Sequence, residues 1–487
     1  MRLTDHDASF LNTETADTPM HGLGIAVVEG VIPFEEAFTT IAKRIHKIPQ
    51  YRRKLAFVPM NLAQPVWVDD DKFDLANHVV PLALAPDSSL EDALEAALAV
   101  GESLLPRDKP LWKLLIVSGV AEKTLVVHIA HHALVDGASG VDISLVLFDI
   151  QQNPAQETDI PKWEPAPAPD LAQLAMQAIG ENTQNFAKRA QQMQSFDGQG
   201  SELVRRATES VTRFISEPVM TAPWNRALVS KGRVFRVLQK PFADVRKIRN
   251  RLGGTVNDVV LSAVVEGATR YMAALDQLPN RSDVTGQHLR VMCPVSVRRE
   301  DEKGALGNRV SGIFPVFDAV VKDAASRLAE VRFETENIKQ NREAQAMQLL
   351  SELMPPMPPS VTGANAVFNS IGLNLSTFNP MSFFSQFMPT PNMVSNIPMA
   401  GFNFTCTNVP GVQTTQYFAG HAISQQYAVL MLAGNLGFGT AILSYDQNLY
   451  FNLVADPKLL EDIDLMMQKI DEVFEELLQL SDQAQAS

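Results

Sequence analysis

The chain has 487 residues, of which 46% are hydrophobic, and its formal net charge at pH 7 is −14. This length predicts two domains with a linker, and an acidic chain without a basic stripe argues against nucleic-acid binding and against a polybasic membrane anchor. No run of about 18 uncharged apolar residues predicts a transmembrane helix, and the polar first residues lack the hydrophobic region of a signal peptide. The two cysteines, Cys293 and Cys406, cannot form a disulfide framework and lack metal-ligand spacing, which fits a reducing cytoplasm.

The first third of the chain is predicted to alternate strands with helices. Clusters of β-branched and aliphatic residues predict the strands, and apolar residues at helical spacing after early acids predict the helices. The strands are expected at 23–29, 110–119 and 123–130, and the helices at 33–48, 88–105 and 138–152.

A change of composition separates this part from the second half. Residues 153–219 begin with a proline-rich spacer and continue rich in Ala and Gln, which predicts a helical crossover linker. Residues 347–404 are rich in Met and Phe with little charge, which predicts lipid handling, with core filling as the alternative. In the second half, strands are expected at 232–239, 288–298, 402–409, 425–432, 437–445 and 449–455, and helices at 242–254, 255–275, 324–344 and 458–480.

The most informative motif is VVHIAHHALVDGASG at residues 126–140. It delivers His131 and His132 at the end of a predicted strand, where an imidazole can act as a base near neutral pH. Gly137 allows a tight turn before a helix, and Asp136 can hold the loop through an ion pair. Buried, hydrogen-bonded histidines are one alternative. A zinc site is another, although adjacent histidines on a strand point opposite ways and no further ligands follow at suitable spacing.

Together with other motifs, this pattern resembles the bacterial wax ester synthase/diacylglycerol acyltransferase family, within the superfamily of chloramphenicol acetyltransferase-like and condensation-domain enzymes. The resemblance covers nearly the whole chain. Thr407 and Val412 stand where the family usually has Ser and Pro, so no substrate preference is transferred through that loop. The motifs are LTDHDASFLNTETADTPMH from residue 3, RDKPLWKLLIV from 107, HHALVDG from 131, TVNDVVL from 255, PVSVRREDEKGALGNRV from 294, TNVPG from 407 and LSYDQNLYFNLVAD from 443.

The resemblance implies an α+β fold of two chloramphenicol acetyltransferase-like domains that meet at a central interdomain tunnel. The expected N-terminal domain, residues 1–152, carries the histidine loop. Residues 153–219 are expected to be the linker, and residues 220–487 the C-terminal domain. The histidine loop is expected at the centre of the tunnel.

The resemblance also assigns roles to individual residues. The catalytic set is His131, His132, Asp136 and Gly137, with His132 as the base, Asp136 as the structural acid and Gly137 as the turn glycine. Arg298 is the hypothetical partner of Asp136.

Three further residues are candidates for substrate binding. Asn257 is expected near the reacting carbonyl, or alternatively as a helix N-cap. Trp112 is expected to line the acyl tunnel, or alternatively to be core. Glu14 matches a family glutamate, and the alternative is a surface acid.

The function implied is the transfer of a long-chain acyl group from acyl-CoA to the hydroxyl of a fatty alcohol or a diacylglycerol. The alcohol attacks the thioester directly, with no acyl-enzyme, no metal and no cofactor. The protein is expected in the cytoplasm, in peripheral contact with the inner membrane or lipid inclusions. The alternatives are a condensation or polyketide-associated acyltransferase served by a carrier protein, a non-catalytic lipid-droplet protein of the same fold, and a zinc hydrolase.

Overall fold

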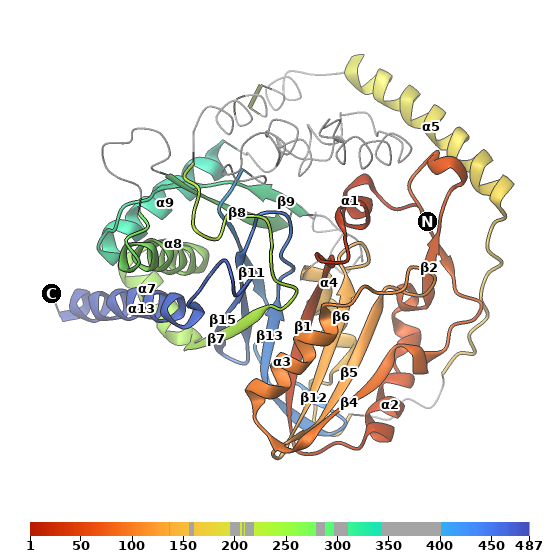
Figure 1. Ribbon diagram of the computed structural model, residues 1–487, viewed down its shortest axis with the longest axis horizontal. Coiled ribbons are helices and arrows are strands. Elements are labelled where there is room, and N and C mark those ends of the chain that lie inside the picture. The colour runs from red at the N-terminus through yellow and green to blue at the C-terminus, as the bar shows by residue number, and fades with distance from the viewer. Residues whose placement is uncertain are drawn as a thin grey trace.

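Two β-sheets, each with helices packed against it, organise the chain into two lobes (Figure 1). This computed structural model describes residues 1–135, 137–154, 160–194, 205–206, 209, 219–278, 288–296, 310–341 and 401–486. The mixture of helices and strands confirms the predicted α+β class.

The sheet of the first lobe has the strand order β12-β13-β1-β6-β5-β4. Neighbouring strands are antiparallel except β4 and β5, which are parallel. The central strands are rich in Val, Ile and Leu, as expected for strands covered on both faces. The strands are β1 (His21–Glu29), β4 (Val79–Ser88), β5 (Trp112–Val120), β6 (Lys123–His131), β12 (Tyr417–Phe418) and β13 (His421–Val429).

Helices and a small hairpin surround this sheet. A capping box between Ser89 and Asp92 starts α3, and Gly101 at its end allows Leu23 of β1 to pack closely against the helix. Figure 1 shows α3 in front of the sheet. The helices are α1 (Asp5–Thr13), α2 (Phe34–Ala42), α3 (Leu90–Gly101) and α4 (Gly137–Leu147), with short turns η1 (Ile45–Lys47), η2 (Pro49–Arg52), η3 (Pro59–Asn61) and η4 (Leu75–Asn77) and the hairpin β2 (Arg53–Ala56) and β3 (Val66–Asp69).

The second lobe has the strand order β10-β8-β11-β14-β15-β7, and β9 pairs with β8. Every residue of β14 is buried, because this strand lies between the helices of its own lobe and the first lobe. The strands are β7 (Val234–Pro241), β8 (His288–Ser296), β9 (Val310–Ile313), β10 (Val316–Asp318), β11 (Phe404–Pro410), β14 (Phe438–Tyr445) and β15 (Asn448–Ala455), and the helices are α7 (Phe242–Leu252), α8 (Val256–Ala274), α9 (Ala324–Gln340) and α13 (Ile463–Ala486).

Two strands from the C-terminal half of the chain belong to the sheet of the first lobe, which corrects the domain division made from the sequence. That division assigned all of residues 220–487 to the C-terminal domain. Strands β12 and β13 instead belong to the first sheet, where β13 pairs with β1 from Leu23↔Val429 to Val28↔Ile423. Sheet membership depends on which strand edge is available, and local sequence does not record this.

The predicted crossover is helical in part. Helix α5 (Leu171–Gln194) lies beside the hairpin of the first lobe, and residues 160–170 before it contain no helix. Leu174 packs with Val66 and Val68, and Ala178 packs in a neighbouring small cluster. The linker helix is therefore anchored on the first lobe by a narrow apolar stripe.

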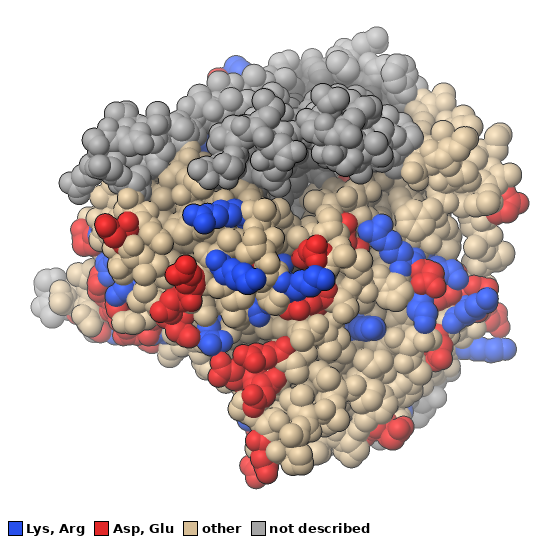
Figure 2. Space-filling view, in the orientation of Figure 1, with Lys and Arg blue, Asp and Glu red and all other residues tan. Residues whose placement is uncertain are grey.

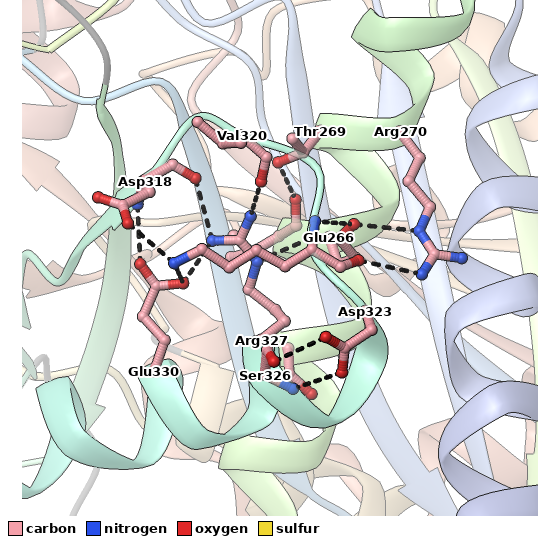
Figure 3. Close-up of polar contacts among 12 residues, drawn as sticks. Glu266, Thr269, Arg270, Asp318, Val320, Asp323, Ser326, Arg327 and Glu330 are labelled. Carbon is pink, nitrogen blue, oxygen red and sulfur yellow. Dashed lines mark hydrogen bonds and ion pairs between the residues drawn. The ribbon is translucent and has the colours of Figure 1, made fainter.

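The helices of the second lobe are joined by a buried ion-pair network (Figure 3). Arg327 of α9 is fully buried and donates to Glu266 of α8, which is also fully buried, at 2.9 Å. Arg327 also donates to Glu330 and to the carbonyls of Asp318 and Val320. Because its donors are paired so completely, the guanidinium can remain charged in the core.

The distribution of surface charge and the composition of the helices are relevant to contact with a membrane. On the face shown in Figure 2, basic side chains lie interspersed with acidic ones. Among the helices of the described residues, none combines the length and the apolar composition needed to cross a membrane. The Met- and Phe-rich stretch predicted to handle lipid lies outside the described residues apart from its last four positions.

Candidate active site

Two adjacent histidines lie at the end of strand β6, and residues next to the neighbouring strands β5 and β1 hold the backbone of both. His131 is the last residue of β6 and lies opposite His21 of β1. Its N–H donates to the carbonyl of Leu111 at 3.0 Å, and the N–H of His132 donates to the carbonyl of Met20 at 2.8 Å. The ladder of hydrogen bonds therefore fixes both histidines from the two sides of β6.

The side chain of His131 is directed at groups of the protein. It is 1% exposed, and its Nδ1 accepts a hydrogen bond from the N–H of Ala133 at 3.0 Å. A neutral His131 must then carry its proton on Nε2. This Nε2 lies 3.3 Å from Oε1 of Glu14. Both ring nitrogens of His131 thus face groups of the protein itself.

The side chain of His132 has a different environment. It is half-buried, and its ring stacks on Phe10 of α1, with ring centroids 4.3 Å apart and an angle of 29° between the planes. Part of the His132 surface remains accessible, whereas His131 is enclosed. Stacking on an aromatic ring limits the orientations of the imidazole.

Glu14 lies directly after α1, and its side chain is 2% exposed. Its carboxylate accepts from the N–H of Met20 at 3.1 Å and from Arg107 at 3.0 Å, in addition to facing His131. Burial alone would raise the pKa of Glu14, but the contacts with His131, Met20 and Arg107 outweigh it and lower the pKa from 4.5 to about 2. The surface-acid alternative for Glu14 is wrong, because the side chain is enclosed, and a role in substrate binding stays a prediction.

Trp112 is a core residue, as the alternative to the tunnel wall predicted. It is 0% exposed, so water does not reach it. Its Nε1 donates to the carbonyl of Tyr51 at 2.8 Å, and its ring is stacked between Tyr51 and His78. The aromatic side chain fixes η2 and η4 against β5.

Asn257 is in the first turn of α8, but it is not the N-cap. Thr255 is the N-cap and forms a capping box with Asp258. The exposed side chain of Asn257 instead accepts a hydrogen bond from Asn408 of β11. Helix α4, which follows the histidine loop, contacts the same strand β11. The second lobe therefore brings the Asn257 and Thr407–Gly411 motifs together beside the helix of the histidine motif.

The remaining predicted residues can be placed only in part. Helix α4 begins at Gly137, as expected for a glycine that turns the chain into a helix. Asp136 and Arg298 lie outside the described residues, so their pairing stays a prediction. The interdomain tunnel likewise stays a prediction. Among the described residues, no three His, Cys, Asp or Glu side chains are grouped as metal ligands would be.

Reasoning from the sequence missed two residues that build the site. Phe10 stacks on His132, and Arg107 ties Glu14 to the carbonyl of Leu11. Both lie within stretches that carried the family resemblance. The available signal was the four-residue spacing of Phe10 and Glu14, which places them on one face near the end of α1.

Comparison with known proteins identifies the family. Residues 3–260, slightly more than half of the chain, match the model of the wax ester synthase/diacylglycerol acyltransferase catalytic domain, and residues 306–478 match that of the C-terminal domain of the same family. The chain belongs to the wax ester synthase/diacylglycerol acyltransferase family. The protein is therefore an acyltransferase of lipid metabolism.

Individual relatives agree with this assignment. A Mycobacterium tuberculosis protein named as a probable diacylglycerol O-acyltransferase is 24% identical over 98% of this chain and 96% of its own length. A wax ester synthase/diacylglycerol acyltransferase from Marinobacter aquaeolei VT8 is similar in structure, with a TM-score of 0.64 and 19% identity over 99% of this chain and all of that chain. The starter condensation domain of rhizomide synthetase, solved with C8-CoA, shares the fold at a TM-score of 0.59 and 12% identity, over 98% of this chain and 94% of that chain.

Proposed function

We propose that the protein transfers a long-chain acyl group from acyl-CoA to the hydroxyl of a fatty alcohol or a diacylglycerol. The products would be a wax ester or a triacylglycerol and free CoA. The names of the relatives support both acceptors, since they include diacylglycerol O-acyltransferases and a wax ester synthase. Acyl-CoA is consumed as a substrate, so the proposed reaction needs no cofactor.

The different exposure of the two adjacent histidines is the observation that supports the proposed mechanism. A general base needs a ring nitrogen that can approach the acceptor hydroxyl. His131 is 1% exposed, so its side chain is enclosed by the protein. His132 is half-buried and fixed by stacking. This difference favours His132 as the base and His131 as a support of the loop.

In the proposed reaction, His132 accepts the hydroxyl proton as the oxygen attacks the thioester carbonyl. A C–O bond forms, and negative charge develops on the carbonyl oxygen. When the C–S bond breaks, the protonated His132 gives its proton to the leaving CoA sulfur. The sequence of steps forms no acyl-enzyme and leaves the histidine in its starting state.

The developing oxyanion needs hydrogen-bond donors. The side-chain oxygen of Asn257 accepts from Asn408, which leaves the Asn257 amide nitrogen as the donor end of that side chain. We assign Asn257 as one donor to the oxyanion. Asn408 then acts as a positioning residue for Asn257.

The proposed substrates are poorly soluble in water, which favours action at a lipid surface. We therefore propose peripheral association with the inner membrane or with lipid inclusions, from the cytoplasm. Co-flotation of the purified protein with phosphatidylcholine vesicles containing diacylglycerol tests this. Recovery only in the dense fractions at low salt would contradict it.

Release of CoA by the purified protein tests the function. Palmitoyl-CoA is supplied with hexadecanol or with diacylglycerol, and an acyl carrier protein thioester with the same acceptors forms a third arm. Turnover with palmitoyl-CoA supports the proposal, whereas turnover with the carrier thioester alone indicates a condensation-type enzyme. A folded protein inactive in every arm indicates the non-catalytic alternative.

Two matched variants test the base. His132→Ala is expected to keep the fold and lose about 10²–10⁴-fold in turnover, the usual cost of removing a positioned general base. His131→Ala is expected to retain more turnover and to lose stability. A folded but inactive His131→Ala protein beside an active His132→Ala protein would reverse the assignment.

A further inference from the structure

An apolar surface lies at one edge of the first lobe, where α5 meets the tip of the β2–β3 hairpin. Asn182 of α5 donates to the carbonyl of Leu62 at 3.0 Å, and Ala178 packs with Val58 and Ala63. Figure 1 shows α5 along the outer edge of this lobe. We call the exposed apolar side chains of the two segments the α5–hairpin patch, which consists of Phe57, Met60, Leu171, Met176 and Ile179.

The α5–hairpin patch faces outward. Met60 is 78% exposed and Met176 is 70% exposed. The residues that anchor α5 on the lobe, Leu174 and Ala178, lie on a different side of the helix from Met176. Apolar side chains that are exposed singly are normal on a soluble protein, whereas a group of them on two adjoining segments indicates an interaction surface.

Charged residues are rare in both segments. Residues 55–66 contain none, and residues 171–184 contain only Glu181, which pairs with Arg2. At the upper right of Figure 2, where α5 lies, the visible surface is largely uncharged. Neither segment contains Lys or Arg to attract anionic headgroups, and the chain as a whole carries a net charge of −14. The charge pattern therefore favours a partner that is apolar and has no net charge.

The backbone at the hairpin tip is strained to hold Met60 in place. Met60 and Asn61 have φ angles of 54° and 51°, in the left-handed region. Asn adopts this region more readily than most residues, whereas a long side chain such as Met is uncommon there. The exposed Met60 side chain gains little from folding, so the strain indicates a function at the surface rather than in the core.

We infer that the α5–hairpin patch inserts into the surface of a zwitterionic phospholipid layer. The inference rests on the lipid association proposed above and names the part of the molecule that makes it. A stable protein dimer buries about 20–30 residues on each side and has a polar rim. The patch has five large side chains and few polar groups around them, which is too small for such a dimer. A lipid layer accepts isolated apolar side chains without a complementary shape.

The patch is connected to the proposed active site through α1. Gln64 at the hairpin tip donates to Asp5, the first residue of α1, at 3.0 Å. Phe10, five residues further along α1, stacks on His132. Five residues of helix span about 7.5 Å. Insertion of the patch would therefore hold His132 close to the layer in which the lipid acceptor is dissolved.

Two charged substitutions test the inference. Met60→Glu and Met176→Glu are compared with the wild type in co-flotation with phosphatidylcholine vesicles. Because each substitution removes a large apolar side chain from the lipid, each is expected to lower the vesicle partition coefficient at least about tenfold. The wild type is expected to bind equally at low and high salt, since charge attraction does not contribute.

Matched controls separate lipid insertion from damage to the fold. Phe333→Glu introduces the same charge in place of a side chain of α9 that is 71% exposed, and it should float like the wild type. Met176→Leu keeps an apolar side chain at the patch and should also float. Melting curves establish that each variant is folded, and the separate variants on the hairpin and on α5 keep the test valid if one of them is not.

Three results would overturn the inference. Flotation of both charged variants like the wild type would show that another part of the chain, such as the Met- and Phe-rich residues 347–404, makes the contact. Tighter binding to phosphatidylglycerol vesicles that is lost at high salt would indicate charge attraction instead. A lipid-free dimer of the wild type that Met60→Glu dissociates in size-exclusion chromatography would assign the patch to a second copy of the chain.

A soluble assay distinguishes failure of the inference from failure of the proposed function. CoA release from hexanoyl-CoA with hexanol needs no lipid surface, so the charged variants should match the wild type in this assay. Flotation tests the patch even if the wild type transfers no acyl group, in which case only the proposed acyl transfer fails. Wild-type protein that stays in the dense fractions would overturn both the inference and the proposed lipid association.

Discussion

The buried carboxylate of Glu14 makes a quantitative prediction about stability. Glu14→Gln keeps the size of the side chain and removes its charge. The contacts with His131, Met20 and Arg107 offset the cost of burial and lower the pKa from 4.5 to about 2. At about 1.4 kcal/mol per tenfold change in acidity, this corresponds to about 3 kcal/mol that the charged form gains from folding. Since the side chain is 2% exposed, solvent screens these contacts little.

The pH dependence has a definite sign. A carboxylate whose pKa is lower in the folded state stabilises the protein above the unfolded pKa, and this contribution is lost as pH falls through the folded pKa. For Glu14 the loss is expected between about pH 4.5 and pH 2. Glu14→Gln should therefore be about 2–3 kcal/mol less stable than the wild type at pH 7, with a difference that narrows below pH 4.5.

Urea unfolding at a series of pH values between 7 and 3 measures this difference. The matched control is Glu35→Gln, because Glu35 is an exposed glutamate on α2 and should behave like the wild type at every pH. Equal stabilities of the wild type and Glu14→Gln at pH 7 would refute the reasoning. A constant difference from pH 7 to pH 3 would also refute it, since the charge would then not be the cause.

Three further changes have expected outcomes. Arg327→Met should destabilise the protein by about 3–5 kcal/mol in urea unfolding, because Glu266 then loses one of its buried cationic partners. Asn257→Ala should lower kcat for CoA release by about 10²–10³-fold with little change in KM, and Asn408→Ala should have a smaller effect on kcat. Dialysis against EDTA should leave CoA release unchanged, and restoration of lost activity by zinc alone would favour the zinc hydrolase instead.

Local patterns in the sequence predicted most of the regular elements. Runs such as residues 123–130 form strands because their β-branched side chains are buried on both faces of a sheet. Strand β4 was missed because Pro81, Pro86 and the positive φ of Asp87 weaken its local pattern. Helix α1 was missed because it is short and polar, and its position depends on burial of Ala8 and Leu11 against the first lobe.

The histidine motif lies at the end of a strand, as predicted, but its surroundings depend on tertiary contacts. Charged residues are rarely enclosed, so a surface position was the natural expectation for Glu14. Its burial depends on the hydrogen bond from Arg107, a residue that is distant in the sequence and lies beside Glu14 only in the folded chain. For Trp112 the sequence left a tunnel wall and the core open, because an aromatic residue in a strand suits both, although it is more often core. Only the stacking of its ring between Tyr51 and His78 shows that Trp112 is part of the core.

The position of β13 in the first sheet restricts how the two lobes can move relative to each other. Strand β13 ends at Val429 in the first sheet, and β14 begins at Phe438 in the second, so a short connection joins the two sheets. Because β1 is paired with β13 along its length, a shift of one lobe against the other would break that ladder or stretch the connection. The separation between His132, beyond the end of β6, and Asn257, held by β11, is thereby restricted. The proposed acyl transfer needs its base and its oxyanion donor at a fixed separation, and if His132 and Asn257 have these roles, this strand supplies that constraint.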